Sequence, residues 1–360
     1  MLRDPVCNMD VREDICITAE CSGVVHYFCS EGCRDKFLKE MACKLLRTSY
    51  DLIIIGGGPA GLTAAVYAST MKIDAFLIAK DLGGQAVDST KIENYMGYDF
   101  ITGPELIEKF REQLVRSHYI DHVLSEVERI QSVEEGFRVT TSEIKTYAAK
   151  AVIIATGMTR KKLGVGGEEK FQRKGVFYGN IQDFSFVQDK DVAVIGGGNS
   201  ALQLVESLKS IAGNIYVVSA TKLTADRAII ERISNISSLR IYEEFKITEF
   251  TGNNTLSGIT IRKMAGEETI CLPVQGVFIA IGFQPNSFLV SNLVELNEHG
   301  EIVIHYDCST SRPGIFAAGD ITNAFGKRII IASGEGAKAA LGARQYLLNL
   351  RRKKEATACA

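Results

Sequence analysis

Runs of apolar residues alternate with stretches of helical periodicity along most of this chain. The run Tyr50–Ile55 passes through a glycine turn into the helical stretch Gly61–Met71. In the same way, Asp191–Ile195 leads into Ser200–Ser210. Further apolar runs are typical of buried strands; they are Ala151–Ala155, Val277–Ile281 and Gly314–Phe316. Strands that alternate with helices predict parallel sheets of the doubly wound α/β class.

The two units of strand, glycine turn and helix are near-repeats of one another. Their first glycines, Gly56 and Gly196, stand 140 residues apart. The chain has 360 residues, and about 150 residues are usual for one domain. We therefore expect two related nucleotide-binding domains of the Rossmann type, with room for a smaller third domain.

Composition and charge exclude several classes of protein. The 41 Lys and Arg residues nearly balance the 43 Asp and Glu residues, so no surface for nucleic acid or for an anionic membrane is expected. No run approaches the roughly 18 apolar residues of a membrane helix, and the N-terminus lacks the pattern of a secretory signal. We therefore expect a protein of the reducing cytoplasm.

Cysteine is distributed unevenly along the chain. Six of the nine cysteines lie within the first 43 residues, before a change of composition at Lys44–Ser49; they are Cys7, Cys16, Cys21, Cys29, Cys33 and Cys43. In a reducing compartment, clustered cysteines are more often metal ligands or redox thiols than structural disulfides. The first part of the chain is therefore expected to have a chemistry of its own.

The first glycine turn matches the pattern G-x-G-x-x-G, directly after a strand and at the start of a helix. Gly56 permits the tight turn, Gly58 lets the backbone approach a pyrophosphate, and Gly61 lets the helix pack closely on the strand. The phosphate charge would lie at the N-terminus of the helix. This context predicts dinucleotide binding; the alternative is a glycine turn without a ligand.

The second glycine turn matches the variant of the pattern that ends in alanine, and it predicts a second nucleotide site or a nucleotide fold without its ligand. Its site residues are Gly196, Gly198, Asn199, Ser200 and Ala201. An acidic residue that binds a ribose hydroxyl is expected about 20 residues after each turn. The strands there end in Lys80 and in Ala220, so ribose recognition must come from elsewhere.

Three further motifs point to one family. They are Gly83-Gly84-Gln85 followed by Glu93-Asn94-Tyr95, then Ile154–Gly157, and Gly314–Asp320. From Tyr50 to about Leu350 the chain resembles the low-molecular-weight thioredoxin reductases, which are class II pyridine nucleotide-disulphide oxidoreductases and include the flavoprotein part of alkyl hydroperoxide reductase. The resemblance implies an FAD domain split around an inserted NAD(P)-type domain, and usually a homodimer. The expected domains are then residues 1–44 (cysteine-rich), 45–162 and 284–350 (FAD), 163–283 (NAD(P)-type) and 351–360 (a frayed tail).

The resemblance also implies which residues contact FAD. These are Gly56, Gly58, Pro59, Ala60, Gly61, Lys80, Gly84, Gln85, Asn94, Thr156, Gly157, Asp320, Lys327, Arg328 and Ile329. Gln85 and Asn94 would lie along the flavin, and Asp320 would hold its ribityl chain. Arg328 stands where the family usually has Gln, and a cation beside N1 would stabilise the anionic reduced flavin and raise its potential. The alternative is that Arg328 points to solvent or to a carboxylate.

One family feature is missing from the inserted domain. Members that reduce disulfides have a C-x-x-C pair there, and Gly179 and Gln182 stand at those two positions in this chain. No C-x-x-C occurs elsewhere in the sequence. No catalytic residue is therefore assigned, and ordinary reduction of thioredoxin is not expected.

A second missing feature concerns the electron donor. Relatives that use NADPH bind its 2′-phosphate with a His-Arg-Arg-x-x-x-Arg stretch, which aligns here with Ser219-Ala220-Thr221 and ends at Ala225. Lys222 and Arg227 are interpreted as solvated surface charges. A preference for NADPH is therefore not expected, and NADH or a protein donor such as ferredoxin remains open.

Near the N-terminus, Cys7, Cys29 and Cys33 have the spacing C-x21-C-x3-C. Residues 4–38 resemble the small YHS domain, also called TRASH, which binds metals. Cys29 and Cys33 lie one helical turn apart, so both sulfurs can face one ion, and Cys7 would return as a third ligand. Thiolates select zinc, copper(I), mercury or iron. Metal would also hold so small a domain folded.

Several assignments in this N-terminal part stay open. The fourth ligand could be His26, Cys21, water or a substrate. Cys16 and Cys43 are interpreted as plain thiols. The alternatives to a metal site are reduced free thiols or a redox disulfide.

Three functions agree with these observations. The first is an FAD-dependent oxidoreductase that passes electrons directly to a small molecule, a protein or a metal ion. The second is a metal-responsive binding or sensor protein whose flavin domain reports the redox state. The third is a disulphide reductase in which the N-terminal cysteines replace the missing pair. Loss of the pair and of the arginine stretch weakens the third function more than the first, and likeness of fold cannot choose the acceptor.

Overall fold

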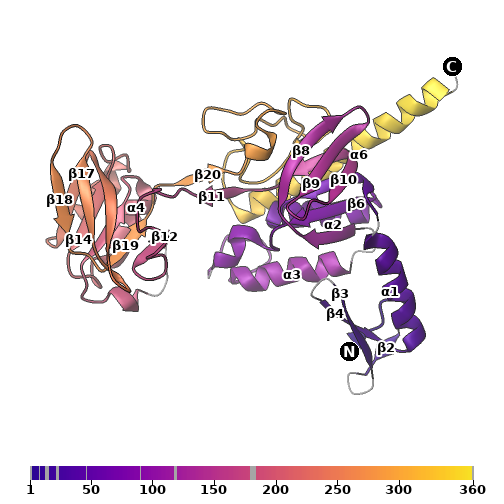
Figure 1. Cartoon of the computed structure of the whole chain (residues 1–360), viewed down its shortest axis with the longest axis horizontal. Coiled ribbons are helices and arrows are strands. Elements are labelled where there is room, and N and C mark those ends of the chain that lie inside the picture. Colours follow the sequence, from indigo (N-terminus) through magenta and orange to yellow (C-terminus); the bar gives the residue numbers. More distant parts are fainter. Residues whose placement is uncertain are drawn as a thin grey trace. The chain divides into compact units, whose positions relative to one another are not determined.

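The computed structural model describes residues 2–7, 9–12, 16–21, 24–45, 47–89, 91–116, 120–178 and 184–358. These fall into two compact units, shown in Figure 1: unit 1 comprises Met1–Met158 with Pro285–Ala360, and unit 2 comprises Thr159–Gln284. The chain passes between the units at 158/159 and again at 284/285; these two points are called crossings below. The domain bounds expected from the sequence, 162/163 and 283/284, lie four residues after the first crossing and one residue before the second. A central segment inserted into a split unit is the arrangement that the resemblance implied.

The sheet of unit 1 has the strand order β7-β6-β5-β10-β9-β8, with β21 also paired to β10. Its strands are β5 (Ser49–Ile55), β6 (Ala75–Ala79), β7 (Ile120–Leu124), β8 (Val127–Val133), β9 (Gly136–Thr141), β10 (Thr146–Ile154) and β21 (Ile315–Ala317). β5, β6, β7, β10 and β21 are parallel, but β8, β9 and β10 form an antiparallel meander. The parallel strands confirm the predicted doubly wound α/β class. The meander is an addition that the sequence did not predict, and its short turns can join only antiparallel neighbours.

Helices α2 (Pro59–Thr70) and α6 (Ile329–Ala358) lie side by side in unit 1 (Figure 1). Their contact is close because α6 presents glycine to the start of α2: a Cβ atom added at Gly336 would lie 2.1 Å from the carbonyl oxygen of Ala60. The unit also contains α3 (Gly103–Val115) and the short helices η1 (Gly84–Asp88) and η3 (Phe288–Val290). These helices enclose a core built on alanine, leucine and isoleucine from both the sheet and α2.

Helix α6 includes most of the segment that the sequence predicted to be a frayed tail. It continues to Ala358 without interruption. The reason is that Arg351–Ala358 consists almost entirely of Arg, Lys, Glu and Ala, which favour helix, and contains neither Gly nor Pro to end it.

Unit 2 contains a parallel sheet of order β12-β19-β13-β14-β15. The strands are β12 (Val176–Tyr178), β13 (Val192–Ile195), β14 (Ile215–Ser219), β15 (Leu239–Glu243) and β19 (Gly276–Ile279). The helices are η2 (Ser185–Val187), α4 (Asn199–Leu208) and α5 (Arg227–Ile233). A second, antiparallel sheet consists of β16 (Phe245–Gly252), β17 (Leu256–Lys263) and β18 (Thr269–Leu272), and the crossing strands β11 (Met158–Arg160) and β20 (Phe283–Pro285) pair with each other.

The N-terminal segment is formed by β1 (Leu2–Arg3), β2 (Asp10–Val11), β3 (Ile17–Cys21), β4 (Val24–Phe28) and α1 (Glu31–Leu45). β1 pairs with β2, and β3 forms a hairpin with β4. Among its described side chains, Val11 and Phe28 are the buried apolar ones, and the ring of Phe28 contacts that of Phe37. This is a small core for a separate folding unit.

In the described part of the chain, none of the helices has the length and apolar character needed to span a membrane.

The close contact between α2 and α6 can be tested with two glycines of α6. We expect Gly336→Ala to lower the free energy of unfolding of the apoprotein by about 1–3 kcal/mol, because its methyl group overlaps backbone that cannot move freely. Gly334→Ala, a matched control on an exposed position with no atom within 4 Å of the added Cβ, should raise it by up to about 1 kcal/mol. Urea unfolding followed by circular dichroism measures both; equal effects of the two substitutions would contradict the packing argument.

Candidate functional site

Of the three glycines that define the G-x-G-x-x-G motif in unit 1, two are required by the packing and one leaves space. Gly56 has a φ of +111°, and a Cβ atom on it would lie 2.3 Å from the carbonyl oxygen of Ala155. A Cβ atom on Gly61 would lie 1.8 Å from the carbonyl oxygen of Gly56. By contrast, a Cβ atom on Gly58 would have no neighbour within 4 Å. Gly56 and Gly61 therefore serve the fold, whereas Gly58 faces open space that a ligand could fill.

The helix N-terminus beside this space is not capped by a side chain. Gly58 is the N-cap of α2 and makes no side-chain hydrogen bond, and Pro59 is the first helical residue. The first backbone N–H groups of α2, beginning with that of Ala60, are thus placed where a phosphate is favoured by hydrogen bonding and by the helix dipole.

The Gly83-Gly84-Gln85 motif lies against the same turn. The backbone N–H of Gly83 donates to the carbonyl oxygen of Gly57 at 2.7 Å, and a Cβ atom on Gly84 would lie 3.3 Å from the Cα of Gly58. The Nε2 of Gln85 donates to the carbonyl oxygen of Met158 at 2.5 Å. Two motifs that are separated in the sequence are therefore brought to one place.

Thr156 and Gly157 are held by a residue that the sequence did not single out. The Nδ2 of Asn286 donates to the carbonyl oxygen of Thr156 at 2.7 Å, and the Thr156 hydroxyl donates to the carbonyl oxygen of Asn286 at 3.1 Å. Gly157 has a φ of +63°, and a Cβ atom on it would have no neighbour within 4 Å. Asn286 follows the second crossing between the units, and no motif in the sequence marks it.

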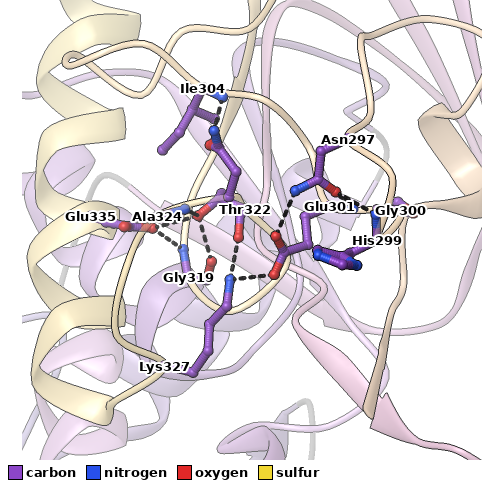
Figure 2. A network of polar contacts seen from close by, with 12 residues as sticks. Asn297, His299, Gly300, Glu301, Ile304, Gly319, Thr322, Ala324, Lys327 and Glu335 are labelled. Carbon is purple, nitrogen blue, oxygen red and sulfur yellow. Dashed lines mark hydrogen bonds and ion pairs between the residues drawn. The ribbon is translucent and has the colours of Figure 1, made fainter. Parts of the chain in front are cut away.

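The loop that carries Asp320 is fixed by a buried carboxylate of α6, shown in Figure 2. The Glu335 Oε2 accepts a hydrogen bond from the Gly319 N–H at 2.7 Å and another from the Thr322 hydroxyl at 3.1 Å. Burial raises the pKa of Glu335, and these two donors oppose the shift. Burial also raises the pKa of the half-buried Asp320, and the positive charges of Lys327 and Arg328 oppose that shift.

The two basic residues expected beside the flavin have different environments. The Lys327 ammonium donates to the carbonyl oxygen of Thr322 and forms an ion pair with Glu301 at 2.9 Å (Figure 2). Glu301 also accepts a hydrogen bond from the Nδ2 of Asn297 at 2.8 Å. The Arg328 side chain is exposed, and its Nη1 donates to the carbonyl oxygen of Lys327 at 2.9 Å. The Lys327 ammonium is thus already bound by groups of the protein, whereas the Arg328 guanidinium pairs with no carboxylate among the described residues.

Three other residues predicted to contact FAD are placed as follows. Lys80, just after β6, forms an exposed ion pair of 3.2 Å with Glu126. Asn94 is exposed, in the loop between the bridged residues Ile92 and Ile101. Ile329 is the first residue of α6 and is half-buried.

The glycine turn of unit 2 repeats the same steric pattern. Gly196 has a φ of +133°, and a Cβ atom on it would lie 2.4 Å from the carbonyl oxygen of Ala280. The nearest atom to a Cβ on Gly198 would be 3.9 Å away. At the start of α4, the Asn199 Nδ2 donates to Asp226 at 2.9 Å, and the Asp226 N–H donates back to the Asn199 Oδ1 at 2.7 Å. Ser200 is exposed and Ala201 is fully buried; Gly179 and Gln182 lie outside the described residues.

Three cysteines of the N-terminal segment come together around a buried carboxylate. The Sγ atoms of Cys7 and Cys29 are 3.4 Å apart, and those of Cys29 and Cys33 are 3.7 Å apart. With one oxygen of Asp4, these sulfurs form a group whose atoms all lie within 4.8 Å of one another. Cys29 precedes α1, and Cys33 is in its first turn, where the Ser30 hydroxyl accepts its N–H at 3.2 Å. The spacing therefore brings the three predicted ligands together.

Asp4 organises this group and was not identified from the sequence. Its side chain is only 1% exposed. Its Oδ1 accepts the N–H groups of Val6 and Cys7 at 2.8 Å and 3.2 Å, and its Oδ2 accepts that of Cys29 at 2.8 Å. Burial alone would raise the pKa of Asp4, but the Cys29 N–H and the other donors outweigh it and hold this pKa far below the usual range. In turn, Asp4 and Cys7 raise the pKa of Cys29 to about 12.

The other predicted ligands do not join this group in the described residues. The His26 ring packs on the Phe37 ring with centroids 4.6 Å apart, and burial lowers the pKa of His26. Cys16 is half-buried, and the side chains of Cys21 and Cys43 lie outside the described part.

Comparison with known proteins extends these observations. The family model "Pyridine nucleotide-disulphide oxidoreductase" matches residues 50–343. The F component of alkyl hydroperoxide reductase from Staphylococcus epidermidis is 36% identical over 300 residues, which are 83% of this chain and 59% of that protein. An NADH dehydrogenase of Ferdinandcohnia aciditolerans is 35% identical over 302 residues, 83% of this chain and 58% of that protein. The chain thus spans about three fifths of the length of these curated relatives.

Solved structures show the same fold. Thioredoxin reductase of Lactococcus lactis superposes with a TM-score of 0.69 at 31% identity, covering 83% of this chain and 99% of that one. Thioredoxin reductase of T. acidophilum has a TM-score of 0.66 at 32% identity, covering 84% and 100%. The family match includes both units and begins after the cysteine-rich segment, at residue 50.

The different roles of the glycines in the first turn predict different effects of substitution. Gly58→Ala should leave the unfolding of the apoprotein unchanged but lower its affinity for FAD by at least about tenfold, or about 1.4 kcal/mol, because the methyl group fills the open space. Gly61→Ala should destabilise the apoprotein itself. Fluorescence titration with FAD and urea unfolding of both variants measure this; tight FAD binding by Gly58→Ala would contradict the assignment.

Proposed function

Because the chain belongs to the pyridine nucleotide-disulphide oxidoreductase family, we propose that it is an FAD-dependent oxidoreductase that works without the paired cysteines of that family. The observation that carries the proposal is the open space at Gly58, framed by the uncapped N-terminus of α2 and by Gly84. When bound, FAD would supply the redox chemistry, taking electrons from a donor and delivering them to an acceptor.

The residues around this space have the donors and acceptors that such a cofactor needs. The first N–H groups of α2 would bind its pyrophosphate. Asp320 would accept hydrogen bonds from ribityl hydroxyls, in a position that Glu335 fixes through the neighbouring Gly319 N–H. Arg328 supports a cationic contact at the pyrimidine edge, because it is exposed and pairs with no carboxylate in the described part of the chain.

The remaining cysteines argue against an alternative thiol relay in the two nucleotide-binding units. Cys308 is fully buried, and burial raises its pKa to about 11, so the reactive thiolate is disfavoured. Cys271 is an exposed single cysteine on β18. With Gly179 and Gln182 at the positions of the redox pair, we propose that the acceptor is reduced directly rather than through a dithiol.

The proposal is tested by recording the visible spectrum of the purified protein and adding donors without oxygen. We expect a flavin spectrum that is bleached by NADH faster than by NADPH, because no arginine stands where relatives bind the 2′-phosphate. Reduced ferredoxin is the third donor to be compared. A protein without flavin would overturn the proposal, and NADPH-driven turnover of thioredoxin would overturn the absence of a dithiol relay.

We also propose that the N-terminal segment binds a thiophilic metal ion through Cys7, Cys29 and Cys33. The proposal is supported by the distances between the three sulfurs and by their accessibility, since Cys7 and Cys29 are exposed and Cys33 is half-buried. Asp4 accepts three backbone N–H groups, which favours a role in positioning over one as a ligand. Three sulfur ligands with an accessible fourth position suit zinc, copper(I) or iron.

Metal binding is tested by elemental analysis of the purified protein and of single variants. We expect about one ion per chain in the wild type and little in Cys29→Ser or Cys33→Ser, because two remaining thiolates hold such an ion far more weakly. Cys271→Ser, which removes an exposed cysteine of unit 2, is the matched control and should keep its metal. Equal metal content in all four proteins would contradict the site and leave the flavin proposal untouched.

A further inference from the structure

The end of β14 is the place where a Rossmann domain normally presents an acidic residue to the adenosine ribose. Ser219 occupies this position and is only 3% exposed. A Cβ atom on Gly197 would lie 2.5 Å from the Ser219 hydroxyl oxygen, so the serine is packed against the glycine turn. Position 197 must therefore stay glycine for this contact to exist. A short, buried serine thus stands where the acid is usual.

The neighbouring strand places a carboxylate beside this position. β15 runs parallel to β14, and the last pair in their register is Ser219 with Glu243. The Glu243 Oε1 accepts a hydrogen bond from the Leu223 N–H at 2.7 Å. Glu243 is thus held against the loop that follows β14, which is the loop where relatives carry their arginines.

That loop is itself fixed to the glycine turn. The N–H groups of Thr224 and Ala225 donate to the carbonyl oxygen of Gly197 at 2.8 Å and 3.0 Å. The Glu243 carboxylate and the open position at Gly198 are therefore parts of one rigid frame within unit 2. These backbone hydrogen bonds therefore fix two places relative to each other: the turn, where a pyrophosphate would bind, and the surroundings of Glu243, where an adenosine ribose would bind.

The charge of Glu243 is not neutralised in the described part of the chain. No Lys or Arg there lies within 4 Å of its carboxylate, and the Leu223 N–H occupies only one of its two oxygens. Arg227, the first arginine after the loop, is 94% exposed and pairs with Glu231 at 3.7 Å. The second carboxylate oxygen is left to accept hydrogen bonds from a ligand.

We propose that Glu243 is the specificity-determining residue of the second nucleotide site. It accepts hydrogen bonds from the ribose hydroxyls of a non-phosphorylated pyridine nucleotide, and its charge repels the 2′-phosphate of the phosphorylated one. The inference rests on the proposed function, in which unit 2 receives the donor. It assigns to the next strand the acid that the end of β14 lacks.

The test is direct binding of two nucleotide fragments to the full chain, measured by calorimetry. The probes are ADP-ribose and its 2′-phosphorylated form, which lack the nicotinamide and need no turnover. For the wild type we expect ADP-ribose to bind at least about tenfold more tightly. Glu243→Gln should reduce this preference to about threefold or less, since the amide oxygen can still accept the Leu223 N–H but the charge is lost.

Two further variants complete the experiment. Glu244→Gln removes the same charge from the adjacent, exposed residue and should behave as the wild type. Glu243→Arg should favour the phosphorylated probe. An unchanged preference in both Glu243 variants would overturn the inference alone, whereas a wild type that binds neither probe would overturn it together with a pyridine nucleotide donor; flavin content tests the FAD proposal separately.

Discussion

The close approach of backbone to backbone at the start of α2 is the constraint on which the rest of unit 1 depends. α2 can begin directly after β5 only because Gly61 has no side chain to meet the carbonyl oxygen of Gly56. Two consecutive residues of α6 then extend this arrangement: Gly336 packs on Ala60, and Glu335 holds the N–H of Gly319. One helix therefore aligns the glycine turn with the loop of Asp320. The space beside Gly58 is a consequence of this packing rather than of any single side chain.

The elements that were predicted correctly are those that a short, continuous stretch of sequence specifies. An apolar run followed by a glycine turn specified β5 with α2 and β13 with α4, to within two residues at most ends. The antiparallel meander of β8, β9 and β10 was missed because alternating, half-exposed strands give a weaker pattern than continuous apolar runs. The helical end of α6 was missed because its residues carry charge without an apolar face, and only their helix propensity indicates the structure.

The site residues divide in the same way. Motifs identified the groups that would face a ligand, such as Gly58 and Asp320, and the cysteine spacing identified three sulfurs that do lie together. The residues that hold these groups in place were not found: Asn286 for Thr156, Glu335 for the Asp320 loop, and Asp4 for the cysteines. Each acts through hydrogen bonds to backbone of a distant segment, and such contacts leave no periodic pattern in the sequence. For this reason, positioning residues are the part of a site that can be identified only from a three-dimensional structure.

The two Rossmann units differ in what lies beside the end of their second strand, where an acidic residue is usual. Neither strand ends in an acid, and in both units a glutamate from or just after the next strand lies beside the end. In unit 1 that glutamate is Glu126, and Lys80 neutralises it. In unit 2 it is Glu243, which has no cationic partner in the described chain and is bound instead by a backbone N–H. Because a neutralised pair neither repels a phosphate nor attracts a hydroxyl strongly, we assign the proposed selection between nucleotides to Glu243 rather than to Glu126. In this proposal, the residue that discriminates between nucleotides lies on the neighbouring strand and not in the glycine motif that identifies the nucleotide site.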